Sequence, residues 1–336
     1  MKEAKFYEKL KDGKVKCQLC PHQCVISQDK RGICGVRENK EGKLYSLVYE
    51  KTISWAIDPI EKKPLYHFYP GEAAFSFATV GCNFTCLNCQ NYTISQLPKK
   101  NKEIPGEKIS PERIVEITRR KGANIIAYTY TEPTIFYEYA YDTCKLASSY
   151  GIKNVFVTNG YIMPEPLKEI SPFLDGANVD LKSMRKDFYR RICGGKLEAV
   201  LESIKLMKEL GIWVEITTLI IPDLNDSDEE LGEIAKFIAN LQDTTPWHIS
   251  RFYPAYKMGN YPPTPVETLH RARKIGLEKG LKYVYIGNVP GDEGENTFCP
   301  ECGRVLIKRR GFWIEKIDIE NGKCKWCGTK IEGVGL

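Results

Sequence analysis

The sequence predicts an α/β fold, a partial or complete TIM-type (β/α) barrel with an N-terminal four-cysteine module and a C-terminal zinc-ribbon-like module. In the middle of the chain, strand-like apolar segments alternate with segments of helical period. Repeating strand–helix units with right-handed crossovers give a parallel sheet with helices outside it. Eleven of the 13 cysteines fall into three groups, and two of these groups lie near the ends of the chain.

The strands of the sheet are expected where short apolar runs occur. There are about seven such units, which favours closure as a barrel over an open doubly wound sheet. No glycine-rich dinucleotide fingerprint supports the second alternative. The expected strands are residues 73–80, 124–130, 154–158, 177–181, 213–220, 247–252 and 282–286.

Helix boundaries follow from capping residues and apolar periodicity. Ser110-Pro111 predicts a helix start, with a capping hydroxyl followed by proline in the first turn. A helical period over residues 197–210 ends at Gly211. Two further helices are expected over residues 226–241 and 264–280.

Composition excludes several classes of protein. The chain is 42% hydrophobic and 27% charged, which excludes a disordered chain. No apolar run approaches the roughly 18 residues of a membrane span, and the polar, mixed-charge start shows no signal peptide. We therefore expect a cytoplasmic protein without a membrane association. In that compartment metal or cluster binding explains 13 cysteines better than disulfides do.

Three domains are expected: residues 1–45 as the N-terminal module, 46–290 as the barrel and 291–336 as the C-terminal module. The net charge of +6 comes from the ends, since residues 1–40 alone hold 10 Lys/Arg against 5 Asp/Glu. A basic surface can meet nucleic acid such as RNA or another acidic partner. A lysine-rich solvated surface is the alternative.

The central group, Cys82, Cys86 and Cys89, has the spacing Cys-x3-Cys-x2-Cys and directly follows the first expected strand. Active sites of barrels lie at the C-terminal ends of the strands. Three thiolates on one short loop can reach three corners of a [4Fe–4S] cluster and leave the fourth iron free. Three cysteines alone cannot close a structural zinc site.

This loop, placed after the first strand of a parallel barrel, resembles that of the radical S-adenosylmethionine (SAM) superfamily. The resemblance implies that Cys82, Cys86 and Cys89 are the catalytic residues that hold the [4Fe–4S] cluster, whose open iron binds SAM. It implies that an electron, from a donor such as ferredoxin or flavodoxin, cleaves SAM to a 5′-deoxyadenosyl radical. That radical removes a hydrogen atom from the substrate.

Later segments also resemble SAM contacts of this superfamily. Tyr130-Thr131-Glu132-Pro133 resembles its Gly-Gly-Glu-Pro segment, with Tyr130 and Thr131 in place of the glycines. Thr158-Asn159-Gly160 and Asp180-Leu181-Lys182 resemble segments of glycyl-radical activating enzymes. The cofactor-binding residues that the resemblance implies are Thr131, Glu132, Asn159, Asp180 and Lys182.

A closer resemblance rests on residues 58–68, 127–134 and 17–37 together with the central cysteine loop. These stretches are similar to the AmmeMemoRadiSam system radical SAM enzymes, which are similar to pyruvate formate-lyase activating enzymes. The resemblance implies an AmmeMemo-type or Memo-type protein as a partner. It leaves the substrate open between a glycine of a partner protein, RNA and a small molecule.

The last four cysteines form two Cys-x2-Cys motifs, Cys299/Cys302 and Cys324/Cys327. This spacing looks like a zinc ribbon, in which four thiolates close a tetrahedral Zn²⁺ site. A rubredoxin-type iron site has the same ligands.

The first four cysteines, Cys17, Cys20, Cys24 and Cys34, are unevenly spaced. Zn²⁺ is the favoured metal, and a second iron–sulfur cluster is the alternative. A rival interpretation of the whole chain is a non-catalytic iron–sulfur and zinc protein that serves as a scaffold for nucleic acid or protein.

Overall fold

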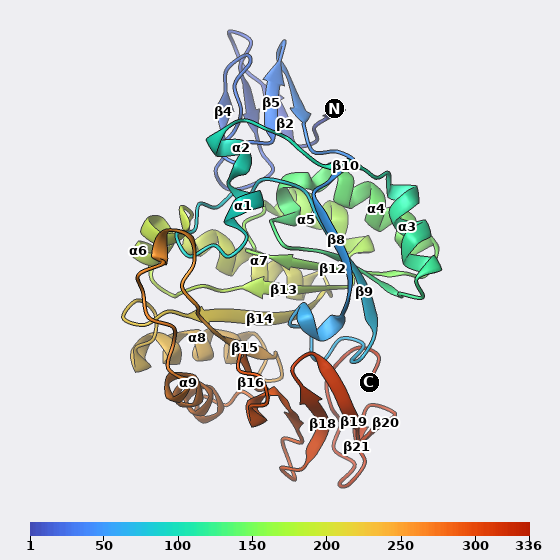
Figure 1. The fold of residues 1–336 in the computed structure, drawn as a ribbon, viewed down its shortest axis with the longest axis vertical. Helices are drawn as coiled ribbons and strands as arrows, with labels where there is room; N and C mark the ends of the chain where they lie inside the picture. The colour runs from blue at the N-terminus through green and yellow to red at the C-terminus, as the bar shows by residue number, and fades with distance from the viewer.

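The computed structural model describes all 336 residues and centres on one eight-stranded sheet (Figure 1). The strand order is β16-β15-β14-β13-β12-β11-β9-β8. All pairs from β9 to β16 are parallel, so the seven strands expected from the sequence are present. They are β9 (Ala73–Ala78), β11 (Ile125–Tyr128), β12 (Lys153–Thr158), β13 (Gly176–Asp180), β14 (Trp213–Ile220), β15 (Trp247–Arg251) and β16 (Val284–Gly287).

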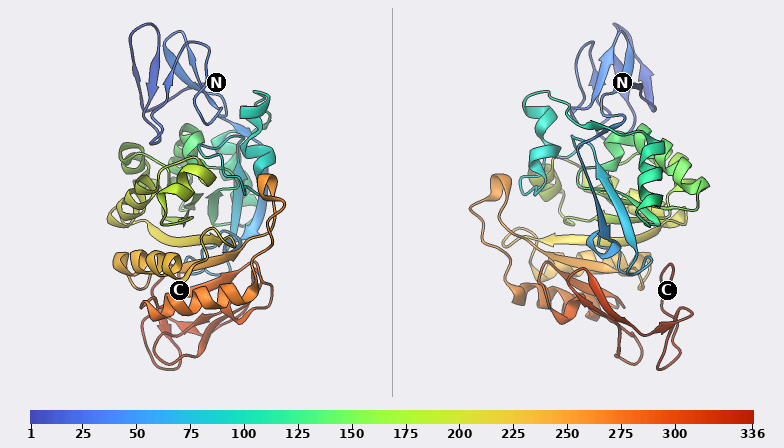
Figure 2. Two further views of the ribbon diagram at one scale, coloured as in Figure 1. Left: turned by 90° about the vertical axis from the view of Figure 1, so that its left-hand side faces the viewer. Right: turned by 45° about the vertical axis from the view of Figure 1, so that its right-hand side comes forward.

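Most of the helices lie along one face of this curved sheet (Figures 1 and 2). Because helices cover that face and loops cover the other, the parallel strands are buried on both sides, as in β11, where all four residues are buried. None of the helices combines the length and the apolar character needed to cross a bilayer. The helices of this layer are α3 (Pro111–Arg120), α4 (Tyr137–Ser149), α5 (Pro164–Ile170), α6 (Lys186–Phe188), α7 (Leu197–Glu209), α8 (Asp228–Leu241) and α9 (Val266–Glu278). Two short helices, α1 (Tyr92–Ser95) and α2 (Leu97–Lys100), lie between β9 and β10 in the chain.

The capping residues act as the sequence predicts. The Ser110 hydroxyl accepts a hydrogen bond from the backbone N–H of Arg113 at the start of α3. Ser227 does the same for Glu230 in α8, whose first turn is acidic and so complements the helix dipole.

The sheet does not close, so the complete barrel considered from the sequence is wrong. β16 pairs only with β15, and the antiparallel strand β8 (Ser54–Pro59), not expected from the sequence, pairs only with β9. The segment that follows β8 and the C-terminal residues fill the gap beside β16. Tyr66 packs with Tyr285 of β16, and the Arg309 guanidinium donates to the carbonyl of Tyr66.

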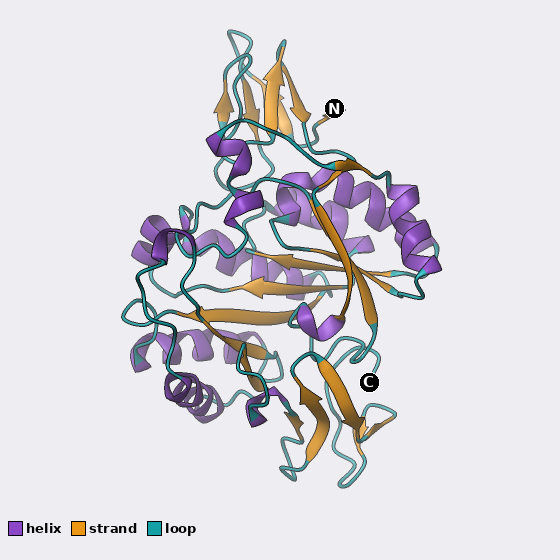
Figure 3. Ribbon diagram, viewed as in Figure 1, coloured by secondary structure: helices purple, strands orange, loops and turns teal.

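Short strands build both ends of the molecule, whereas the helices gather in the middle (Figure 3). The N-terminal end has two three-stranded antiparallel sheets, and a two-stranded ladder of β7 (Lys51–Thr52) and β10 (Glu107–Lys108) follows. The N-terminal strands are β1 (Lys2–Glu3), β2 (Tyr7–Lys9), β3 (Val15–Cys17), β4 (Val25–Ile26), β5 (Arg37–Lys40) and β6 (Lys43–Ser46). The C-terminal strands are β17 (Thr297–Phe298), β18 (Val305–Arg310), β19 (Trp313–Ile317), β20 (Ile319–Glu320) and β21 (Lys323–Cys324).

Candidate functional site

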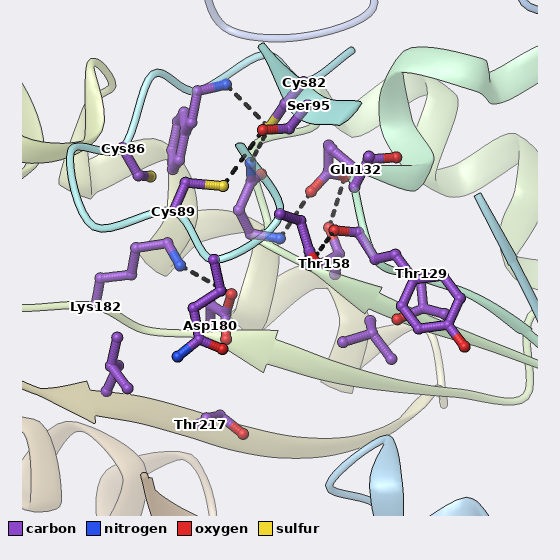
Figure 4. A pocket seen from close by; sticks show the side chains of 18 of the residues that line it. Cys82, Cys86, Cys89, Ser95, Thr129, Glu132, Thr158, Asp180, Lys182 and Thr217 are labelled. Carbon is purple, nitrogen blue, oxygen red and sulfur yellow. Dashed lines mark hydrogen bonds and ion pairs between the residues drawn. The ribbon is translucent and has the colours of Figure 1, made fainter. Parts of the chain in front are cut away.

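A cavity of about 400 Å³ lies at the C-terminal edge of the parallel strands. Side chains from β12, β13 and the loops after β9 and β11 converge on it (Figure 4). The structure therefore brings together residues as far apart in the chain as Lys62 and Asn288. The lining includes every residue of the barrel expected from the sequence to act in catalysis or cofactor binding: Cys82, Cys86, Cys89, Thr131, Glu132, Asn159, Asp180 and Lys182.

The cysteine loop is held against the segment Tyr189–Cys193. The backbone N–H of Thr85 donates to the carbonyl of Cys193 at 2.8 Å. Gly194 makes this approach sterically feasible, since it adopts a φ of +77° and a Cβ there would lie 2.3 Å from the Thr85 hydroxyl. The loop is thus fixed by backbone contacts before any cofactor binds.

The three thiols of the loop fit an iron–sulfur cluster. Burial raises the pKa of Cys82 and of Cys89, and a hydrogen bond with Cys193 together with burial raises that of Cys86. Such thiols ionise when a cationic metal core binds them. Asn88 lines the same cavity, and its buried Oδ1 atom has no hydrogen-bond partner in the protein. The cavity therefore offers three soft ligands and a free acceptor.

Glu132 is fully buried and links the ends of two strands. Its Oε1 atom accepts from the backbone N–H and the hydroxyl of Thr134 and from the hydroxyl of Thr158, at 3.0, 2.6 and 2.8 Å. Its Oε2 atom accepts from the backbone N–H of Asn159 at 2.8 Å. Burial raises the pKa of Glu132. The carboxylate thus already serves four protein donors and positions Asn159, in addition to lining the cavity.

Tyr130 and Thr131 stand where the superfamily segment Gly-Gly-Glu-Pro has its two glycines. The backbone at Tyr130 nevertheless has a conformation that is typical of glycine. Tyr130 has a φ of +60°, in the left-handed region that glycine favours. Its hydroxyl donates to Asp58, and its carbonyl accepts from the Asn91 side chain at 2.7 Å. The Thr131 hydroxyl donates to the carbonyl of Thr79. These contacts hold the strained turn at the cavity wall.

Asp180 and Lys182 form an ion pair at the end of β13. The Lys182 Nζ atom lies 2.8 Å from Asp180 Oδ2, and the lysine side chain is only 18% exposed. Burial alone would lower the pKa of Lys182, but the nearby Asp180 carboxylate and the thiol of Cys86 raise it. A fixed cation and a partly exposed carboxylate suit a zwitterionic ligand.

Sequence reasoning missed several polar residues of the cavity. Three of them follow the C-terminal ends of strands or lie close to them, where barrel active sites form, whereas one lies in the middle of β14 and one in the short helix Tyr92–Ser95. They are Ser95, Thr129, Thr217, Ser250 and Asn288.

A second cavity of about 380 Å³ adjoins the first. Gln90, Thr217, Ser250 and Asn288 line both, so the two cavities share a wall. His248 lies in its wall, paired with the fully buried Glu215 at 2.6 Å. Phe312 of the C-terminal module also reaches it.

The four C-terminal cysteines lie close enough together to hold one metal ion. Their sulfur atoms all lie within 4.8 Å of one another. Cys299 and Cys327 are 3.6 Å apart, and Cys302 and Cys324 are 3.8 Å apart. Zinc–sulfur bonds of about 2.3 Å in a tetrahedron place the sulfurs about 3.8 Å apart. Hydrogen bonds from Thr329 lower the pKa of Cys327 to about 6, which favours the thiolate that a metal needs.

The four N-terminal cysteines also converge, but more loosely. Cys17, Cys20, Cys24 and Cys34 line one small apolar cavity together with His22. No three of them have sulfur atoms that all lie within 4.8 Å of one another. The structure thus distinguishes the two four-cysteine groups by their spacing.

Comparisons with known proteins agree with this geometry. The sequence profile described as the radical SAM superfamily matches residues 77–238. An uncharacterized protein of Methanocaldococcus jannaschii is 53% identical over 335 residues, 99% of each chain. The pyruvate formate-lyase-activating enzyme of Clostridium pasteurianum is 25% identical over 210 residues, which cover 60% of this chain and 87% of that one.

Among solved structures, SuiB of Streptococcus suis bound to S-adenosylmethionine has a similar fold, with a TM-score of 0.51. The match covers 68% of this chain and 53% of that one at 13% identity, so the likeness concerns the fold alone.

Proposed function

The chain belongs to the radical SAM superfamily, and from this premise we propose that it cleaves SAM reductively in the cavity beside the cysteine loop. The resulting 5′-deoxyadenosyl radical removes a hydrogen atom from a second substrate. The observation that supports this is the convergence of Cys82, Cys86 and Cys89 with the Asp180–Lys182 pair around one cavity.

Cys82, Cys86 and Cys89 would hold the cofactor. A [4Fe–4S] cluster bound by three thiolates supplies the electron that breaks the sulfonium bond and one iron that can bind SAM. The chain's own side chains orient SAM. We assign Lys182 to its carboxylate and Asp180 to its ammonium, because this ion pair is preformed and lines the cavity. Asn159 and Thr131 also line the cavity.

The rival interpretation, a non-catalytic scaffold, has no support. A scaffold does not need a 400 Å³ polar cavity beside its cysteine loop. Relatives of this superfamily, such as the activating enzyme of Clostridium pasteurianum, are enzymes.

We propose that the second substrate binds in the second cavity. This cavity shares a wall with the first and opens between the sheet and Phe312 of the C-terminal module. By analogy with the activating enzyme, the substrate is a segment of a partner protein. A Memo-type or AmmeMemo-type protein of the AmmeMemoRadiSam system is our specific candidate, with a ferredoxin or flavodoxin as electron donor.

RNA is a second candidate, favoured by one surface feature. Trp326 of the C-terminal module is 47% exposed. Arg304 lies over its ring at 4.9 Å, and Lys316 and Lys325 lie within 6.0 Å of the ring centre. Bases stack on exposed aromatic rings beside cations. Loss of RNA binding in Trp326→Ala, with partner binding retained, would favour RNA over protein.

Anaerobic reconstitution, followed by reduction with dithionite in the presence of SAM, tests the proposed activity. We expect 5′-deoxyadenosine from the wild-type protein and none from Cys86→Ala. Cys144→Ala is the matched control, because Cys144 is buried in α4 away from the cavity. A wild-type protein with a full cluster that binds SAM but forms no 5′-deoxyadenosine would refute the proposal.

A further inference from the structure

The spacing of the N-terminal cysteines differs from that of the C-terminal cysteines, which suits zinc. A single zinc ion draws four sulfurs to about 3.8 Å from one another. The C-terminal cysteines have this tight spacing, whereas Cys17, Cys20, Cys24 and Cys34 do not. In a cubane cluster each thiolate binds a different iron, so the sulfurs stand farther apart. Cys82, Cys86 and Cys89 likewise do not form a group with all sulfur atoms within 4.8 Å of one another.

A buried cation faces the N-terminal cavity without a full set of acceptors. Arg37 lines this cavity and is only 2% exposed. Its terminal nitrogens bind Glu138 and the carbonyl of Lys5, but its Nε atom has no partner. A buried donor of this kind calls for an acceptor. The sulfide or thiolate sulfur of an anionic cluster is one.

A backbone amide also points at one of the sulfurs. The N–H of Ile33 donates to Cys24 Sγ at 3.5 Å. Hydrogen bonds to the sulfurs are among the levers by which proteins tune the potentials of iron–sulfur clusters.

The N-terminal cavity lies directly beside the SAM cavity. The His22 Nε2 atom is 2.8 Å from the carbonyl of Asn83, the residue after Cys82. Gly81, the residue before Cys82, packs so closely that a Cβ there would lie 3.0 Å from the carbonyl of Cys34. Only one layer of backbone therefore separates the two groups of cysteines.

We propose that Cys17, Cys20, Cys24 and Cys34 hold a second iron–sulfur cluster, in place of zinc, that passes single electrons to the cluster at Cys82, Cys86 and Cys89. The transfer forms and breaks no bond. A reduced one-electron carrier protein is oxidised by one electron, the N-terminal cluster relays it, and the cluster beside SAM is reduced by one electron. The relay rests on the proposed function, whereas the identity of the metal does not.

The surface near Cys24 suits an acidic electron carrier. Val25 and Ile33 flank this cysteine and are 59% and 47% exposed. Residues 1–40 carry 10 Lys/Arg against 5 Asp/Glu. Complementary charge speeds the encounter of weakly bound redox partners, and a small apolar patch is enough for transient docking.

Metal analysis of the anaerobically purified chain tests the cluster without relying on activity. Two cubane clusters and one zinc site predict about eight iron atoms and one zinc per wild-type chain. The triple variant Cys82→Ala/Cys86→Ala/Cys89→Ala should keep about four irons and a reducible paramagnetic signal. The control variant Cys144→Ala should contain the same amounts of iron and zinc as the wild type. A wild-type chain with about four irons and two zincs, or a triple variant without iron, overturns the assignment.

The relay is tested by two further measurements. In the doubly reduced wild-type protein, the electron paramagnetic resonance spectrum should be broader than the sum of the triple-variant spectrum and that of Cys24→Ser. Additive spectra overturn the relay. The yield of 5′-deoxyadenosine with reduced ferredoxin, relative to dithionite, should fall at least about tenfold in Cys24→Ser. An unchanged ratio also overturns the relay, whereas no product with dithionite in the wild type refutes the proposed function instead.

Discussion

The Glu132 carboxylate, in the loop after β11, accepts a 2.8 Å hydrogen bond from the backbone N–H of Asn159, the residue after β12. The same carboxylate binds Thr134, which lines the N-terminal cysteine cavity. This one buried side chain thus connects the segments after β11 and β12, and through Thr134 it also contacts the wall of the N-terminal cysteine cavity. Its main task is to shape the site, and this distinguishes it from a residue that only contacts SAM.

Glu132→Gln should therefore weaken both the fold and SAM binding. An amide offers one acceptor oxygen where the carboxylate offers two, so at least one buried N–H loses its partner. We expect a loss of about 2 kcal/mol in the free energy of unfolding and about tenfold weaker SAM binding. Chemical denaturation and equilibrium dialysis measure the two effects. Glu165→Gln, an exposed change in α5, is the control. Weaker SAM binding at unchanged stability would contradict the shaping role.

Lys182→Met should weaken SAM binding while leaving the cluster in place. The methionine keeps most of the apolar stem but loses the cation that pairs with Asp180 at 2.8 Å. Loss of one charge-assisted contact corresponds to about 10- to 100-fold weaker SAM binding. Iron content should remain at the wild-type value. Lys186→Met is the matched control, since Lys186 is 80% exposed on α6. Equal effects of the two changes would rule out our assignment of Lys182.

Much of the fold was predictable because its signals are local. The apolar run of β11 and the capping hydroxyl of Ser110 act within a few residues of themselves. The open sheet was not predictable in this way. It depends on Tyr66 and Arg309, 243 positions apart, which meet in the gap beside β16. No periodicity within a segment reports such a contact.

Some features of the candidate site could likewise be predicted from local sequence patterns, whereas others could not. The cysteine spacing and the Asp180–Lys182 alternation are local patterns, and both lead to residues of the cavity. The left-handed backbone of Tyr130 was hidden, because a tyrosine gives no sign of a φ of +60°. The tight and wide spacings of the two four-cysteine groups were likewise invisible, since they are properties of tertiary structure.

Cys302→Ser should release the C-terminal metal without disturbing iron. The module buries only a small apolar cluster around Tyr66, Tyr285 and Ile307, too little to hold it together alone. We expect the loss of one zinc per chain and faster proteolysis within residues 299–336. Iron content should match that of Cys144→Ser. If proteolysis of this segment does not change, metal binding does not stabilise the module.

The last prediction concerns His67, which joins the segment after β8 to the C-terminal residues. Its Nδ1–H donates to the carbonyl of Glu332, and its Nε2 atom accepts from the Tyr285 hydroxyl. Burial lowers the pKa of His67 to about 4, and this effect outweighs the nearby Glu215 carboxylate. Since the unfolded chain binds the proton more readily, the neutral form contributes stability above a pH of about 6.5 that is lost as the pH falls towards 4.

Between pH 7 and pH 5 this linkage should cost the wild-type protein about 2 kcal/mol of unfolding free energy. The His67→Gln side chain keeps a donor and an acceptor but cannot titrate. Between pH 7 and pH 5 the variant should therefore lose about 2 kcal/mol less unfolding free energy than the wild type. His270→Gln, a change at a half-exposed histidine, should keep the wild-type slope. Comparing variants at each pH cancels any acid loss of metal that all three proteins share. Parallel curves for the wild type and His67→Gln would show that His67 does not carry the pH dependence.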